Sequence, residues 1–74
     1  MVYFKRNDLI TLVGIISYQK AIAINPNFAE AYFNMAISYA KLDNHNQATT
    51  CFQKAARLGD KNAQNALKEQ GLSW

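Results

Sequence analysis

The sequence predicts an all-α fold of stacked antiparallel helix-turn-helix units that ends in a C-terminal capping helix. Three observations predict it: apolar residues recur at helical spacing, polar breaks separate these stretches, and one segment returns 34 residues further along the chain. The chain has 74 residues, of which 50% are hydrophobic and 18% charged. This size and composition favour one folded domain over residues 1–74.

The recurrence is the most informative of the three observations. Residues 18–21 read Tyr-Gln-Lys-Ala, and residues 52–55 read Phe-Gln-Lys-Ala. The same offset pairs Gly14 with Ala48, so small residues stay small and large residues stay large. A helix-turn-helix unit that cannot cover its own apolar face stacks on a copy of itself, and a period of this length is typical of such units.

The first element is a helix over residues 8–26, expected to be the second helix of a truncated first unit. Its helical spacing runs from Gly14 through Tyr18 to Ala21. The β-branched stretch at residues 10–16 leaves a strand as the alternative. Pro26 ends the helix, because the residue before a proline is pushed out of helical dihedral angles.

A complete unit is expected over residues 28–60. Apolar residues at three- and four-residue steps predict helices over 29–42 and 47–58. The polar turn between them, residues 43–46, offers Asn44 or Asn46 as the cap of the second helix.

The last element is a helix over residues 61–71 that caps the stack. Gly59 offers a left-handed stop for the preceding helix, and Asp60 offers an N-cap. The helix carries only a narrow apolar stripe and ends at Gly71. A narrow stripe with a polar remainder is typical of a terminal helix that faces water.

These residues resemble the tetratricopeptide repeat, and segment 55–64 is also similar to the join between Sel1-like repeats. The closing proline of the tetratricopeptide pattern is replaced by Asp60, and only residues 1–6 remain for the first helix of the first repeat. We therefore expect either a piece of a longer array or a missing helix supplied by another chain. The matching positions are Tyr32, Met35, Ala36, Tyr39, Ala48, Phe52 and Ala55.

The resemblance implies a non-catalytic module that binds a protein or peptide. In this family the first helices line a concave groove that holds an extended peptide or a partner's helix. The alternative for Phe33 and Ile37 is contact with a neighbouring helix. Asn34 and Lys68 match two positions of the family's clamp for a C-terminal carboxylate, but the rest of that clamp is missing. The expected groove residues are Glu30, Phe33, Asn34, Ile37, Ala40 and Lys41.

A second interaction surface is expected on the first helix. In that helix Leu12, Val13 and Ile16 would face outward, next to Leu9. A helix that is apolar all round is usually buried on both sides. We therefore expect these four residues to form an oligomer interface, and self-association is the alternative function.

Other functions find little support in the sequence. The net charge of +3 is spread along the chain without a basic cluster, which argues against nucleic-acid binding. The longest apolar stretch, residues 9–16, is too short to span a membrane. The single cysteine, Cys51, is expected to be a small buried hydrophobic residue; its lack of a disulfide partner within the chain either favours a reducing, cytoplasmic location or carries no information on location. One cysteine and one histidine, His45, which we expect to pack against the fold, indicate neither catalysis nor a metal or other cofactor.

Overall fold

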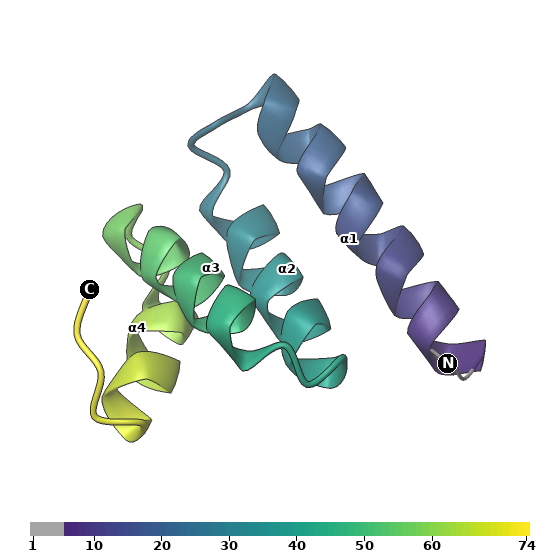
Figure 1. Ribbon diagram of the computed structural model, residues 1–74. Helices are drawn as coiled ribbons and strands as arrows, with labels where there is room; N and C mark the ends of the chain where they lie inside the picture. Colours follow the sequence, from purple (N-terminus) through teal and green to yellow (C-terminus); the bar gives the residue numbers. More distant parts are fainter. Residues whose placement is uncertain (1–5) are drawn as a thin grey trace.

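The computed structural model describes residues 6–74, which form four α-helices. Successive helices run in opposite directions and follow one another across the molecule, from α1 at one side to α4 at the other (Figure 1). The result is a slab of 36 × 30 × 15 Å. The helices are α1 (Arg6–Ile24), α2 (Ala29–Lys41), α3 (His45–Arg57) and α4 (Lys61–Glu69).

The all-α prediction is confirmed. The strand alternative for residues 10–16 is wrong, because this stretch lies inside α1. The helix keeps Ile15 and Tyr18 on the side that packs against α2. This tertiary contact outweighs the preference of β-branched residues for strands. The expected remnant of an earlier helix, residues 1–6, lies outside the described residues except for Arg6.

The break between α1 and α2 is a turn built by Asn25. Its backbone N–H donates to the carbonyl of Ala21 at 2.9 Å, and its side-chain oxygen accepts from the N–H of Asn27 at 3.2 Å. A short polar side chain that bonds the backbone two residues on competes with helix continuation. With Pro26 following directly, the helix ends at Ile24, as the sequence predicts.

Each of the other three helices, α2, α3 and α4, is followed by one residue in the left-handed backbone region. Gly59 has φ 99° and Gly71 has φ 73°, which confirms both predicted stops. After α4, the N–H of Gly71 donates to Lys68 at 3.0 Å and that of Leu72 donates to Leu67 at 2.9 Å. This pair of bonds satisfies the last carbonyls of the helix. After α2 the left-handed position is held by Asp43, with φ 59°.

Replacing Asp43 by glycine is expected to raise the free energy of unfolding by about 0.5 kcal/mol. Glycine relieves the left-handed strain, but it also gains freedom in the unfolded chain, so the net gain is small. Urea unfolding followed by far-UV circular dichroism measures it. Asp43→Ala is the matched control and should be less stable than the wild type, because alanine lacks the short polar side chain that makes the left-handed region more accessible to aspartate. The reverse order of the two variants would contradict this account.

Side chains cap the N-terminal ends of α3 and α4. The Asn44 side chain accepts a bond from the N–H of Gln47 at 3.4 Å, and the Asp60 side chain accepts one from the N–H of Ala63 at 2.8 Å. Each cap satisfies a backbone donor that lacks a partner within the helix. Asn44 is thus the cap, and Asn46 lies inside the helix. The expectation that His45 packs against the fold is wrong, because it is exposed at the first position of α3.

The core consists of two clusters that join neighbouring helices. The first joins α1, α2 and α3 through Ile15, Met35, Ala36 and Cys51. The second joins α3 and α4, where alanines allow close approach of the helices around a fully buried Leu67. The residues of the second cluster are Ala55, Ala56, Ala63 and Leu67.

The two residues that begin the recurring segment have related environments. Tyr18 of α1 packs against the first cluster, next to α2. Phe52 of α3 packs against both clusters, and so contacts the second cluster beside α4. Each aromatic ring therefore fills the space towards the helix that follows its own, which is the stacking that the 34-residue recurrence predicts.

Candidate functional site

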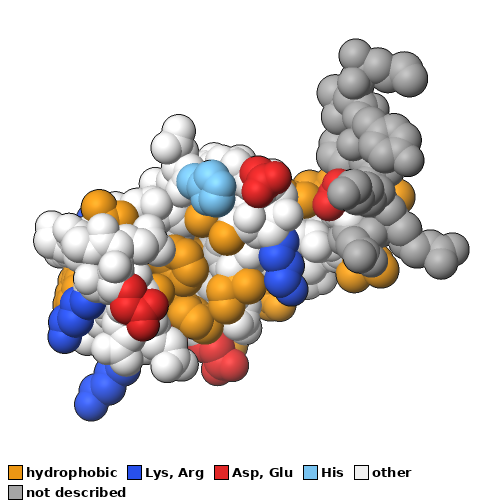
Figure 2. Space-filling view, turned by 90° about the horizontal axis from the view of Figure 1, so that it is seen from below, with side chains coloured by type: hydrophobic (Ala, Val, Ile, Leu, Met, Phe, Trp, Pro, Cys, Tyr) orange, Lys and Arg blue, Asp and Glu red, His pale blue; other side chains and the backbone are white. Residues whose placement is uncertain are grey.

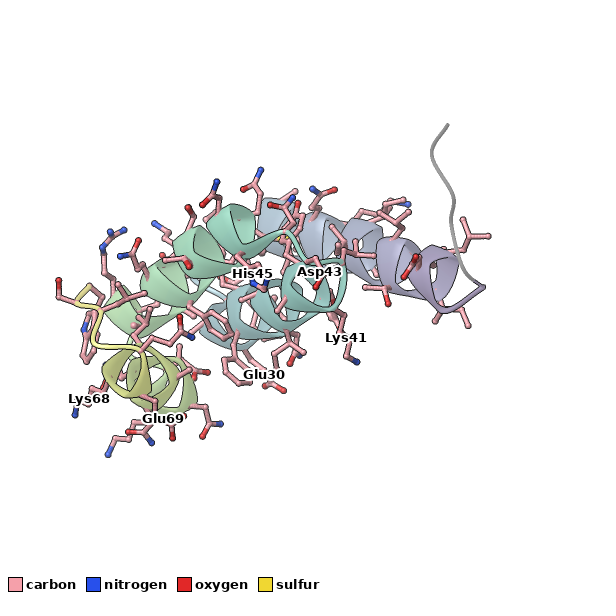
Figure 3. All side chains as sticks on the ribbon, turned by 60° about the horizontal axis from the view of Figure 1, so that its bottom comes forward. Glu30, Lys41, Asp43, His45, Lys68 and Glu69 are labelled. Carbon is pink, nitrogen blue, oxygen red and sulfur yellow. The ribbon has the colours of Figure 1, made fainter. Side chains whose placement is uncertain are left out.

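The candidate site is a stripe along the outer face of α2. Glu30, Asn34, Ile37 and Lys41 follow one another at steps of four, three and four residues, so they share one face of the helix. Glu30 and Lys41 are exposed, and the two residues between them are half-buried. Figure 3 shows Glu30 and Lys41 projecting from the same side of α2. At 1.5 Å per residue they stand about 16 Å apart along the helix axis.

Phe33 lies beside this stripe and also belongs to the packing of the fold. Its ring meets the ring of Phe52 edge-on, with centroids 5.7 Å apart and an angle of 61° between the planes. Phe33 also packs against the second cluster. Contact with a neighbouring helix is therefore what the structure shows for Phe33. Ile37 is half-buried and, of the described side chains, is not among those that pack on either cluster.

Apolar and charged side chains are arranged together on this side of the molecule. Figure 2 shows hydrophobic side chains gathered in the middle of the view, with His45 and charged side chains of both signs around them. Figure 3 places Glu30 and Lys41 on α2, and Lys68 and Glu69 on α4. The surface thus combines an apolar centre with a mixed-charge border, an arrangement typical of protein-binding surfaces.

Helix α4 adds polar groups, but they have contacts of their own. The side-chain amide of Gln64 donates to the carbonyl of Ala56 at 3.0 Å. The ammonium group of Lys68 lies 5.9 Å from the centre of the Trp74 ring. The contact with Trp74 was not predicted from the sequence, because it depends on how the last residues fold back. Lys68, the second matching position of the carboxylate clamp, therefore already contacts an aromatic ring.

The predicted oligomer interface lies on the outer side of α1. Leu9, Val13 and Ile16 are 56%, 63% and 52% exposed, and Leu12 is half-buried. Sequence reasoning missed Ile10, which is 66% exposed on the flank of this surface. Single exposed aliphatic residues are common, but several together on one helix face mark a candidate interaction site.

The groups that could support chemistry, Cys51 and His45, have different surroundings: Cys51 is buried and His45 is exposed. Burial raises the pKa of the Cys51 thiol, which keeps it protonated and unreactive. Among the described residues, no group of three or more His, Cys, Asp or Glu side chains is placed to hold a metal ion. Over the same part of the chain, no helix combines the length and the apolar character needed to cross a bilayer.

Two curated proteins are similar to part of this chain. They are the probable UDP-N-acetylglucosamine–peptide N-acetylglucosaminyltransferases SPINDLY of Oryza sativa subsp. japonica and of Hordeum vulgare. Each is 35% identical over 43 residues, which is 58% of this chain but only 5% of the relative's length. A match to so small a part does not carry the transferase activity over to this chain. No solved structure gives a significant match.

A family model identifies the repeat itself. Residues 17–50 match the model described as tetratricopeptide repeat. The match begins inside α1, contains all of α2 and ends inside α3. It therefore covers both helix junctions that surround the candidate site. The chain contains a tetratricopeptide repeat within residues 17–50.

Proposed function

We propose that this chain is a non-catalytic module that binds a peptide or a helix of another protein along the outer face of α2. The tetratricopeptide repeat indicates a protein–protein interaction module, which is the general basis of the proposal. The single observation that supports this particular face is that half-buried Ile37 lies between the exposed charges of Glu30 and Lys41. The binding surface proposed is Glu30, Phe33, Asn34, Ile37 and Lys41.

The chemistry of this face defines the kind of partner. An apolar side chain of the partner would contact Ile37 and the accessible edge of Phe33. A basic group would lie near Glu30 and an acidic group near Lys41, about 16 Å apart along α2. Such complementary charges at the rim set the orientation of the bound segment, while the apolar centre supplies most of the affinity.

Replacing Ile37 by aspartate is expected to weaken binding of such a segment at least tenfold. The change places a carboxylate in the apolar centre of the surface, where a partner would have to desolvate it. The probes are peptides selected from a displayed random library on the wild-type protein, titrated by fluorescence anisotropy. The matched control is Thr50→Asp, which adds the same charge at an exposed position of α3.

The two possible failures of this experiment have different meanings. Selected peptides that bind wild type and Ile37→Asp equally well would place the site elsewhere. A library that yields no binder to the wild type would contradict the binding function itself. Phe33→Asp is unsuitable as the test variant, because Phe33 packs against Phe52 and its loss lowers the stability of the fold.

The exposed aliphatic face of α1 favours self-association as a second candidate. Full burial of one large aliphatic side chain contributes about 1.5 to 3 kcal/mol, so covering four partly exposed ones in each of two chains contributes about 8 kcal/mol. Association itself costs about 4 to 15 kcal/mol in lost freedom of motion. Self-association through Leu9, Leu12, Val13 and Ile16 is therefore expected to be weak. Sedimentation over a range of concentrations tests it.

A further inference from the structure

We propose that α1 pairs with α1 of a second copy of this chain in an antiparallel, two-fold symmetric arrangement. In this pair Leu9 contacts Ile16 of the second copy, and Leu12 contacts Val13 of the second copy. The inference rests on the second candidate function, self-association. It adds the occupant of the α1 face, the direction of the two helices and the residues that meet.

The first argument compares α1 with its repeat equivalent, α3. The residues 34 positions after Val13 and Ile16 are Gln47 and Thr50, and both are exposed. These two positions of the repeat therefore face water, and in α3 they carry polar side chains. In α1 the same two positions carry aliphatic side chains that are more than half exposed. The packing of the repeat does not require them, so another surface is expected to cover them.

The aliphatic face is also separate from the side of α1 that holds the fold together. Ile15 is buried in the first cluster, and Tyr18 and Ile22 pack against that cluster. The exposed residues Val13 and Ile16 interleave with these in sequence but lie on the other side of the helix. A second copy can therefore cover the outer side of α1 without disturbing its contact with α2.

A head-to-tail contact between α1 and α4 of another copy is disfavoured by the sequence of α4. In α2, the large residues Tyr32 and Met35 pack into the first cluster. The residues 34 positions later are Ala66 and Glu69, and Glu69 is exposed. Helix α4 thus lacks the large apolar residues that would receive a further helix. The outer face of α1 must find its complement elsewhere.

The pattern on α1 is its own complement. Reversing the helix about the point between Leu12 and Val13 exchanges these two residues, and it exchanges Leu9 with Ile16. A two-fold interface requires this property, because the same patch must serve both copies. None of the four residues carries a charge, so the centre of the pair contains no like-charge repulsion.

The size of the surface sets the strength of the dimer. Helix α1 has 19 residues, so it is about 28 Å long and presents a face about 11 Å wide. A footprint of about 300 Å² is smaller than the roughly 800 Å² per partner of a standard interface. The dimer is therefore expected to be weak, with a dissociation constant of about 1 mM.

Disulfide trapping tests the pairing directly. The native Cys51 is first replaced by alanine, and circular dichroism checks that the helices remain. In the antiparallel pair the two copies of residue 13 are offset by only about 1.5 Å along the helices, so Val13→Cys should form a linked dimer on mild oxidation. The two copies of residue 9 are offset by about 10 Å, too far for a disulfide. The same holds for the two copies of residue 16.

The decisive sample mixes two variants. Neither Leu9→Cys nor Ile16→Cys alone should form a linked dimer, whereas an equimolar mixture of the two should link in at least tenfold higher yield. The matched control is Gln47→Cys, at the equivalent exposed position of α3, which should remain unlinked. Sedimentation of the unmodified chain between 10 µM and 1 mM is expected to show the 8.4 kDa monomer converting to a dimer as concentration rises.

Each other outcome overturns the proposal in a recognisable way. A linked dimer of Leu9→Cys alone would show that the two copies of α1 run parallel. That result would contradict the antiparallel pairing but not self-association. An unmodified chain that stays monomeric up to 1 mM would contradict both the antiparallel pairing and self-association itself. A monomeric chain that sediments with phosphatidylcholine–phosphatidylglycerol vesicles would show that the face contacts lipid, and would overturn the proposal of a second copy.

Discussion

Replacing Leu67 by alanine is expected to lower the free energy of unfolding by about 3 kcal/mol. Among the side chains that the structure describes, Leu67 is the largest that is buried completely, with none of its surface exposed. It packs against Ala55, Ala56 and Ala63, and these alanines cannot reach into the cavity that its removal leaves. Because small domains have only about 5 to 15 kcal/mol in total, this single change removes a large share of the stability.

Leu72→Ala is the matched control for Leu67→Ala. The residue is a leucine just after the same helix and is 38% exposed, so its removal is expected to cost less than 1 kcal/mol. Urea unfolding followed by far-UV circular dichroism measures both variants. Similar midpoints for the two variants would show that Leu67 does not hold α4 in place.

Enlarging Ala55 to leucine is expected to destabilise the fold by about 2 kcal/mol. Ala55 has no exposed surface and lies in the second cluster. Tyr32, Phe33 and Phe52 pack against that cluster from the sides. The added carbon atoms have no free volume to enter, so α3 would have to move away from its neighbours. Thermal unfolding followed by circular dichroism gives the loss as a lower midpoint.

Ala23→Leu makes the same chemical change where space is available. Ala23 is exposed on α1, and the substitution is expected to change the stability by no more than about 0.5 kcal/mol. If Ala55→Leu also unfolds at the wild-type temperature, the alanines are not what sets the distance between the helices. That result would contradict the packing described for the second cluster.

The order and type of the helices could be predicted from the sequence because their signals are local or periodic. The recurrence of residues 18–21 at 52–55 fixes the period, and helical spacing of apolar residues identifies the segments. Pro26, Gly59 and Gly71 act through their own backbone preferences, so each predicts a helix end without knowledge of the rest of the fold.

Features that depend on the distance between helices could not be predicted in this way. Phe33 shares the exposed side of α2 by spacing, but its ring reaches Phe52, and this follows only from how α2 crosses α3. The choice of Asn44 over Asn46 as cap follows from the left-handed turn at Asp43, a conformation that aspartate adopts less often than glycine. The exposure of Ile10 likewise depends on which side of α1 packs against α2.

The order of packing has a consequence for how the chain reaches its native state. The main contacts join α1 to α2, α2 to α3 and α3 to α4, all of them neighbours in the sequence. Chains with such short-range contacts need to close only small loops, and they fold within microseconds to milliseconds. Amide hydrogens are expected to exchange slowest in α2 and α3, which have a neighbour on each side, and faster towards both ends.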